Sequence, residues 1–160
     1  NKATARKLTD GFEGDALGRE GGIIVKLADR YRPAVVLAFR AYVDKNPYEE
    51  IKFRLNFYTL KKVLPYKSIP QKSIIVTSKI KSGVLEVDLE PYDIVLKEDF
   101  AITLEWIKDF GNSGWSSGLR FAMRRFGPKC VFRYASQDSW SAYSGLLAPS
   151  PCMNVTVGYK

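Results

Sequence analysis

Residues 51–60 alternate hydrophobic and polar side chains, and this alternation constrains the fold more than any other feature of the chain. The hydrophobic row of this stretch, IKFRLNFYTL, includes Phe53, Leu55 and Phe57. A period of two residues is typical of a β-strand with one buried face, because successive side chains point to opposite faces. The sequence therefore predicts a strand here, with a polar row that organises the sheet rather than carrying out chemistry.

Eight further stretches have β-strand character and are separated by turn signals. They cover residues 23–27, 34–43, 73–80, 83–89, 100–107, 117–126, 129–135 and 152–159. No segment repeats hydrophobic residues with the period of a helix over three turns. About nine strands at regular spacing predict an all-β fold, a single antiparallel β-sandwich that is jelly-roll-like.

The chain has 160 residues, the length of one ordinary domain, and 46% of them are hydrophobic. Residues 1–20 are polar and contain several glycines, which is typical of a lead-in or a linker. We therefore expect residues 1–20 to lie outside the domain and residues 21–160 to form the β-sandwich.

The chain contains no histidine, so it lacks the commonest general base and a common zinc ligand. Two cysteines are too few for a metal cage. We expect no enzymatic activity, no cofactor and no metal site. The alternative enzyme is a glycan-active one that uses carboxylates alone, with Glu105 or Asp99 as a candidate.

Glu105 lies within a predicted strand between hydrophobic neighbours, where an acidic side chain usually has a partner. Alternation places it opposite the core row of that strand, which is Phe100, Ile102, Leu104 and Trp106. Arg54 has the equivalent position in its own strand. We therefore predict that Arg54 and Glu105 are structural partners.

The formal net charge of +8 is uneven, because residues 110–160 carry 6 Lys and Arg against 1 Asp. Flexible loops of this third also carry aromatic rings, and loops on a rigid scaffold commonly hold binding sites. The candidate ligand-binding residues are Trp115, Arg124, Arg125, Trp140 and Tyr143. The competing interpretation is that the two tryptophans fold back over the ends of the sandwich and that the positive charge is an ordinary solvated surface.

Residues 51–107 resemble a family of secreted or surface proteins of Bacteroidetes-type bacteria, in which a carboxypeptidase-like regulatory domain precedes a β-rich domain. The shared pattern is F-R-x-N-x-Y, then V-x-V-D-L-x-x-Y-x-I, then E-D-F-x-x-x-L-E-W. Here its residues are Phe53, Arg54, Asn56, Tyr58, Val87, Asp88, Leu89, Tyr92, Ile94, Glu98, Asp99, Phe100, Glu105 and Trp106. The resemblance implies a jelly-roll-like sandwich, export from the cytoplasm and a role in surface binding or assembly, and it supplies no catalytic residues.

An extracytoplasmic location would be oxidising, and Cys130 and Cys152 both fall near the start of predicted strands. We therefore predict a disulfide between them, with two buried thiols as the alternative. No apolar stretch approaches the roughly 20 residues that a membrane-spanning helix needs.

Together these features predict a non-catalytic binding or scaffolding module in the periplasm, at the outer membrane surface or secreted. The expected partner is a protein or an acidic glycan at the cell surface. Nucleic acid is disfavoured, because no run of five or six basic residues occurs. The alternative function is a carbohydrate-binding module that uses its loop aromatics.

Overall fold

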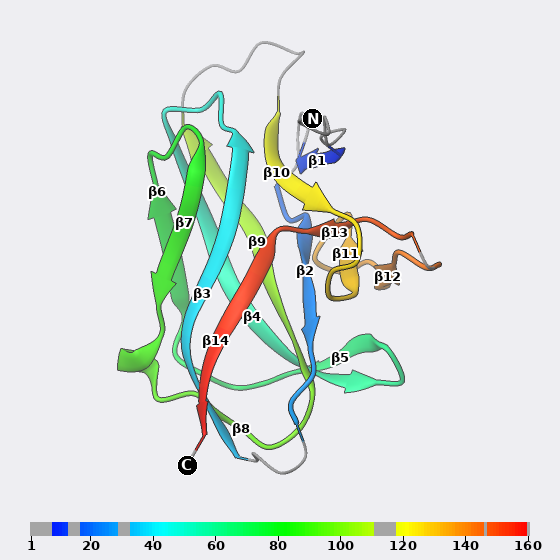
Figure 1. The fold of residues 1–160 in the computed structure, drawn as a ribbon. Coiled ribbons are helices and arrows are strands. Elements are labelled where there is room, and N and C mark those ends of the chain that lie inside the picture. Colours follow the sequence, from blue (N-terminus) through cyan, green and yellow to red (C-terminus); the bar gives the residue numbers. More distant parts are fainter. Residues whose placement is uncertain (1–7, 13–16, 29–32, 111–117, 146, 160) are drawn as a thin grey trace, which may run out of the picture.

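The computed structural model describes residues 8–12, 17–28, 33–110, 118–145 and 147–159. Within these ranges the regular structure is β-strand, apart from one short 3-10 turn, η2 (Glu90–Tyr92). The strands form two antiparallel sheets that pack face to face (Figure 1). The predicted all-β sandwich is therefore confirmed.

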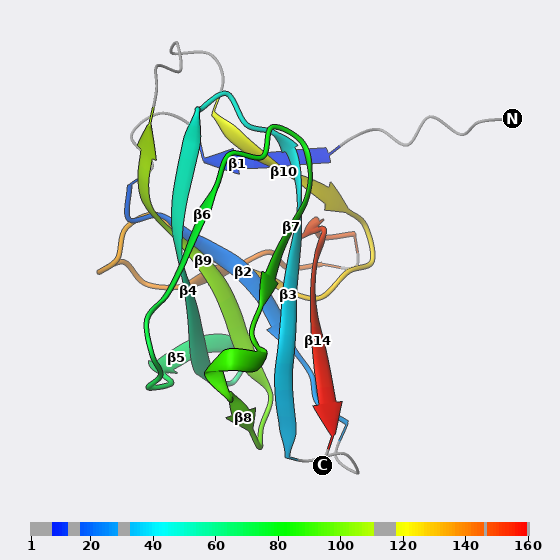
Figure 2. The same cartoon turned by 90° about the vertical axis from the view of Figure 1, so that its left-hand side faces the viewer.

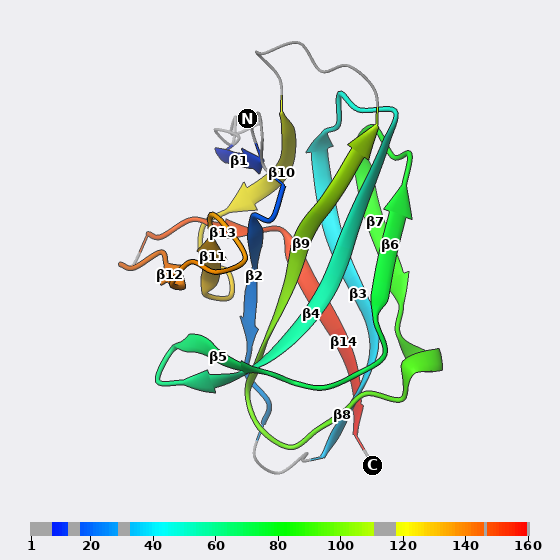
Figure 3. The same cartoon turned by 180° about the vertical axis from the view of Figure 1, so that it is seen from behind.

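Strand β3 is the centre of one sheet, which we call the β3 sheet. Its strands are β1 (Leu8–Phe12), β3 (Ala34–Lys45), β7 (Gly83–Asp88), β8 (Val95–Leu96), β10 (Leu119–Arg124), β13 (Ser150–Pro151) and β14 (Met153–Tyr159). The other sheet, the β4 sheet, lies behind it in Figure 1 and in front of it in Figure 3. Its strands are β2 (Glu20–Val25), β4 (Glu50–Lys61), β5 (Leu64–Ser68), β6 (Ile74–Ser78), β9 (Phe100–Phe110), β11 (Cys130–Arg133) and β12 (Ser141–Ala142).

Each of the nine predicted strands is present, as β2, β3, β4, β6, β7, β9, β10, β11 and β14. The structure adds β1, β5, β8, β12 and β13, which sequence analysis did not identify. Three of these additions, β8, β12 and β13, contain only two residues each, too few to show an alternating pattern. The chain passes repeatedly from one sheet to the other, and a jelly roll describes this connectivity only approximately.

The hydrophobic core lies between the two sheets, which Figure 2 shows nearly edge-on. Both predicted core rows face it, and none of their side chains is more than 1% exposed. These side chains are Phe53, Leu55 and Phe57 of β4 and Phe100, Ile102, Leu104 and Trp106 of β9. Strands β4 and β9 pair along almost their whole length, so the two rows form one continuous wall of the core.

A smaller hydrophobic cluster lies on the other face of the β4 sheet, away from the main core. Ile24, Tyr58, Ala101 and Val131 form it. Leu60 and Leu64 at the β4–β5 turn pack against it, as do Trp140 and Ala142. This second cluster explains why the outer face of the β4 sheet is partly covered rather than open to solvent.

The segment expected as a lead-in contains ordered structure. Strand β1 pairs with β10 along five residues, and β2 begins at Glu20, which is 1% exposed. The polar composition of this segment concealed both strands, because the buried acid of β2 is satisfied by partners from elsewhere in the chain. Among the described residues no helix is long and apolar enough to cross a membrane.

Candidate functional site

Four charged residues form a row across the outer face of the β4 sheet. The strand register places Arg133 of β11 opposite Glu20 of β2. It also places Glu20 opposite Glu105 of β9, and Glu105 opposite Arg54 of β4. Two glutamates are thus neighbours with an arginine at each end, an arrangement that compensates the repulsion between the two carboxylates.

Glu20 is the most deeply buried member of this row, and its side chain has no exposed surface. Its Oε2 accepts hydrogen bonds from Arg133 Nε at 2.9 Å and Nη2 at 2.5 Å. Its Oε1 accepts from Asn56 Nδ2 at 2.9 Å, from the Tyr58 hydroxyl at 3.0 Å and from Thr103 Oγ1. A carboxylate offers about four acceptor positions, so Glu20 is saturated.

Glu105 is also held by several donors. Arg54 Nη1 lies 3.2 Å from Glu105 Oε2, so the expected ion pair is present, with the Arg54 side chain 45% exposed and that of Glu105 13% exposed. Asn56 Nδ2 donates to the same oxygen at 3.1 Å and therefore bridges the two glutamates. Ser136 Oγ donates to Glu105 Oε1 at 3.0 Å.

Tyr58 is the titratable group of this network whose pKa is strongly altered. Burial raises the pKa of its hydroxyl most, and the negative charge of Glu20 raises it further, partly offset by Arg133. The phenol therefore remains protonated and donates to Glu20 throughout the physiological pH range. Its chemistry here is that of a fixed donor.

This network does not have the geometry of a carboxylate-only glycosidase. A general acid or nucleophile needs an accessible oxygen, whereas Glu20 and Glu105 are occupied by donors. Asp99, the other sequence candidate, is six residues from Glu105 in the chain, which corresponds to about 20 Å along an extended strand. Such carboxyl groups act from about 5 to 10 Å apart, so this pair cannot flank one glycosidic bond.

The network instead fixes the turn that follows β11. Arg133 Nη1 donates to the carbonyl of Ser136 at 2.5 Å. The Arg133 guanidinium also lies 4.8 Å from the ring centre of Trp140, and Trp140 meets Tyr58 edge to face at 5.2 Å. Trp140 is thus half-buried and packs on Tyr58 at the outer face of the β4 sheet.

The other predicted ligand-binding residues are dispersed. Arg124 and Arg125 are exposed at the end of β10, and Tyr143 is half-buried against Phe132, with ring centres 4.9 Å apart. Trp115 lies outside the described residues. Trp140 thus packs on Tyr58 and Tyr143 on Phe132, whereas the two arginines are exposed to solvent.

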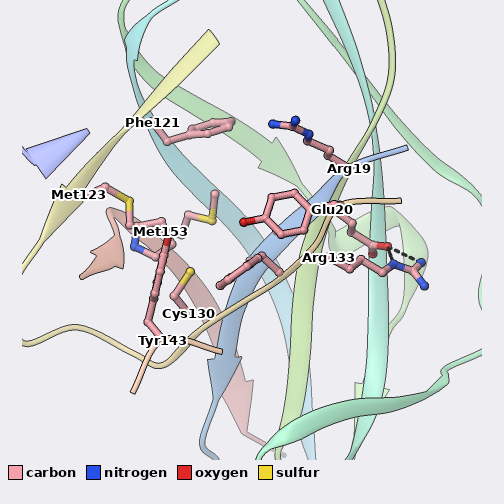
Figure 4. Close-up of a pocket in the computed structure, with 13 residues that line it drawn as sticks. Arg19, Glu20, Phe121, Met123, Cys130, Arg133, Tyr143 and Met153 are labelled. Carbon is pink, nitrogen blue, oxygen red and sulfur yellow. Dashed lines mark hydrogen bonds and ion pairs between the residues drawn. The ribbon is translucent and has the colours of Figure 1, made fainter. Parts of the chain in front are cut away.

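An apolar pocket of about 110 Å³ lies where the edges of the two sheets part (Figure 4). Its walls come from β10, β13 and β14 of the β3 sheet and from β2 and β11 of the β4 sheet. The side chains that surround it include Phe121, Met123, Phe132, Tyr143 and Met153. Of the predicted ligand-binding residues that the structure describes, Tyr143 lines this pocket.

Two arginines lie near the pocket, and their side chains point in different directions. Arg19 points toward the pocket in Figure 4, and its guanidinium lies 5.5 Å from the ring centre of Tyr134. Arg133 and Glu20 point away from the pocket and are paired with one another. The pocket therefore has an apolar interior with one cation beside it, while the charged row belongs to the opposite face of the β4 sheet.

The predicted disulfide is not present in the structure, where Cys130 and Cys152 are both free cysteines. Cys130 is buried and lines the pocket. Pro151 and Met153 also line it, and alternation along the chain directs Cys152, which lies between them, to the other side.

Sequence analysis missed Glu20, Arg133 and the pocket for different reasons. The domain boundary expected after residue 20 excluded Glu20, although an acid directly before the hydrophobic run GGIIV was a usable signal. Arg133 lies in a predicted strand, and its partner is 113 residues away. The pocket combines strands from distant parts of the chain, so no local pattern indicates it.

Comparison with protein-family models, with curated proteins and with solved structures finds no match to this chain.

Proposed function

We propose that the chain is a non-catalytic binding module located outside the cytoplasm, and that its apolar pocket receives a hydrophobic side chain of a protein partner. The observation that carries this proposal is the pocket between β2, β11, β10 and β13. Aromatic and methionine side chains in such a recess are adaptable anchors for a partner.

The size and chemistry of the pocket favour a protein partner over a sugar. A volume of about 110 Å³ suits one aromatic or long aliphatic side chain. The walls are mainly apolar, whereas the hydroxyl groups of a sugar need polar partners. Arg19 beside the pocket offers a cation to an acidic residue that flanks the anchor.

Two further observations support the remainder of the proposal. The absence of catalysis is supported by the saturated carboxylate of Glu20 and by the three donors that hold the Glu105 carboxylate. The extracytoplasmic location is supported by the resemblance of residues 51–107 to bacterial surface proteins. The alternative of a carbohydrate platform built from loop aromatics is weakened by the packing of Trp140 on Tyr58.

A peptide library displayed on phage, selected against the whole chain, tests this function. We expect the enriched peptides to share one large hydrophobic residue with a neighbouring acid. Binding should be lost in Met123→Lys, which places a charge in the pocket wall, and retained in Val84→Lys, which changes an exposed position of the β3 sheet.

Circular dichroism and urea unfolding would establish that both variants fold. If Met123→Lys does not fold, Tyr143→Ala provides the same test by enlarging the pocket. Enriched peptides that bind all three variants as tightly as the original chain would contradict the proposal. Failure to enrich any peptide would also contradict it.

A further inference from the structure

The outer edge of the β4 sheet is strongly basic. Residues 51–81 contain 8 Lys and Arg and no Asp or Glu. They form β4, β5 and β6, and the last two strands pair with successive parts of β4 along its outer edge. The positive charge of the molecule is therefore concentrated on one structural unit, which attracts anions and raises their local concentration.

A polar cleft of about 310 Å³ lies at this edge, between β4 and the segment that joins β5 to β6. This volume is at the lower end of the roughly 300–1,000 Å³ of small-molecule sites. The polar side chains that line it are Arg54, Asn56, Ser68, Gln71, Lys72 and Ser73. The cleft thus combines two cations with amide and hydroxyl groups.

Arg54 belongs both to the charged row and to the lining of the cleft, and its remaining N–H groups can donate to a ligand. Its Nη1 pairs with Glu105, and its side chain is 45% exposed. Gln71 Nε2 donates to the carbonyl of Leu55 at 3.5 Å, which fixes the orientation of the amide. Gln71 Oε1 is then left buried without a donor among the described residues, so a hydroxyl group that reached it would satisfy it.

An exposed aromatic ring lies beside the cleft. The β4–β5 hairpin projects from the sandwich at the lower right of Figure 1, and Tyr66 on it is 54% exposed. Lys61 and Lys67 place their ammonium groups 5.1 and 5.5 Å from the centre of this ring. Tyr66 lies two residues before Ser68 of the cleft, about 7 Å along the strand, and the register of β5 against β4 shifts along this stretch.

We propose that this edge binds a polysaccharide whose sugar units carry carboxylate groups. One sugar unit occupies the cleft, with its carboxylate on Arg54 and Lys72 and its hydroxyl groups on the serines and Gln71. A neighbouring unit stacks on Tyr66 between the two lysines. This site shares no residue with the apolar pocket, so the inference does not rest on the proposed protein-binding function.

The observations favour this ligand over nucleic acid, which is the other common polyanion. Binding of single-stranded nucleic acid uses several aromatic rings for successive bases, whereas this edge exposes one ring beside a hydroxyl- and amide-lined cleft. They also favour it over a neutral glycan, because only an acidic one offers a carboxylate to Lys72 and to the Arg54 donors that Glu105 leaves available.

Calorimetric titration of the whole chain with an oligogalacturonate tests the inference, and the same oligosaccharide with methyl-esterified carboxylates is the matched ligand control. We expect binding of the acid form and at least about tenfold weaker binding of the ester, because hydrogen bonds to charged groups are stronger than neutral ones. Lys72→Ala and Tyr66→Ala should each weaken binding of the acid form by about tenfold.

Arg125→Ala is the matched control variant, because it also removes one exposed positive charge but lies away from the β4 edge. Equal losses in Lys72→Ala and Arg125→Ala would overturn the inference in favour of non-specific charge attraction. Equal affinity for the acid and the ester would overturn the role of the carboxylate. Tighter binding of a single-stranded oligonucleotide than of the oligogalacturonate would assign the edge to nucleic acid instead.

Met123→Lys distinguishes this site from the apolar pocket. It should abolish peptide binding and leave oligogalacturonate binding unchanged. Loss of both activities in this variant would contradict the independence of the two sites.

Discussion

Glu20 is the residue on which the outer face of the β4 sheet depends. Its carboxylate joins β2 to β4, β9 and β11 through Asn56, Tyr58, Thr103 and Arg133. A buried charge of this kind is stable only while its partners remain, because the loss of one leaves the other desolvated and unpaired. Replacement of a buried member of the charged row should therefore lower the free energy of unfolding much more than replacement of an exposed member.

Glu20→Gln should lower the free energy of unfolding by about 3 kcal/mol, because it leaves the buried Arg133 guanidinium without its counter-charge. Arg54→Gln removes a charge from the same row, but its side chain is 45% exposed, so the loss should stay below about 1 kcal/mol. Urea unfolding followed by tryptophan fluorescence measures both. Similar losses of unfolding free energy in the two variants would show that the effect of a charge in this row does not depend on its burial.

Tyr58 makes the stability of the folded chain depend on pH in the alkaline range. Burial and the Glu20 carboxylate raise the pKa of the Tyr58 hydroxyl in the folded chain, whereas in the unfolded chain it ionises near its ordinary value of about 10. The contribution of Tyr58 to stability is therefore complete below pH 10 and is lost as the pH rises above it. The expected slope approaches about 1.4 kcal/mol per pH unit.

Urea unfolding of the original chain and of Tyr58→Phe between pH 8 and pH 11.5 isolates this contribution, because the other titrating groups are common to both proteins. We expect Tyr58→Phe to be the less stable protein at pH 8, by about 1–3 kcal/mol, because Glu20 loses a donor. The difference should narrow above pH 10. A constant difference across the whole range would show that Tyr58 is not held protonated by the fold.

At the level of single residues, sequence patterns identify the Arg54–Glu105 pair but not its neighbours. Both members of that pair are charged residues within strongly alternating strands. The alternation therefore predicts that their side chains lie on the same face of the sheet. Glu20 and Arg133 have no such pattern, since glycines follow Glu20 and the strand containing Arg133 is only four residues long. The partners of a buried charge are set by strand register, which is a property of the folded sheet.

Among the elements, β2 approaches its neighbour β9 closely at Gly22. A Cβ atom at Gly22 would lie 2.0 Å from the carbonyl oxygen of Ile102 and 2.6 Å from the Cα atom of Thr103, both backbone atoms of β9. Backbone cannot move aside as a side chain can, so β2 must separate from β9 if a larger residue is present. The position of β2 sets the position of Glu20, so this contact also maintains the charged row.

Gly22→Ala should destabilise the chain by about 3 kcal/mol or more, because it overpacks one of the central strand pairs of the β4 sheet. Gly158→Ala in β14 is the matched control, since its Cβ would meet only the side chain of Leu37, at 3.3 Å. That side chain can rotate, so a much smaller loss is expected. Equal unfolding midpoints for the two variants would contradict the close approach of β2 and β9.

Element prediction from sequence succeeds where a strand is long and has one buried face. Strands β4 and β9 meet this condition over eleven or twelve residues each. Strand β5 was missed because its sequence, LPYKS, contains a proline and mostly exposed side chains. The hairpin that β5 forms with β4 carries Tyr66, so the missed element is also the one on which the glycan site depends.

At the level of the whole molecule, the two sheets touch along most of their length and part at one edge. The apolar pocket lies at this edge, between strands that are distant in sequence. The positive charge of residues 51–81 is likewise inconspicuous along the chain, because residues 82–109 carry 8 Asp and Glu against 2 Lys. The core was thus predictable from local alternation, whereas the pocket and the basic edge arise from how the sheets are assembled.

The apolar pocket is the proposed binding site for a hydrophobic side chain of a protein partner. The chain contains only two methionines, Met123 and Met153, and both line this pocket. A spectrum of the whole chain labelled with ¹³C at the methionine methyl groups therefore has two signals, and both report on the pocket. Titration with a peptide recovered from the phage selection should shift both signals and saturate them at one common Kd. Saturable binding of that peptide, measured by calorimetry, with both methyl signals unmoved would contradict the account.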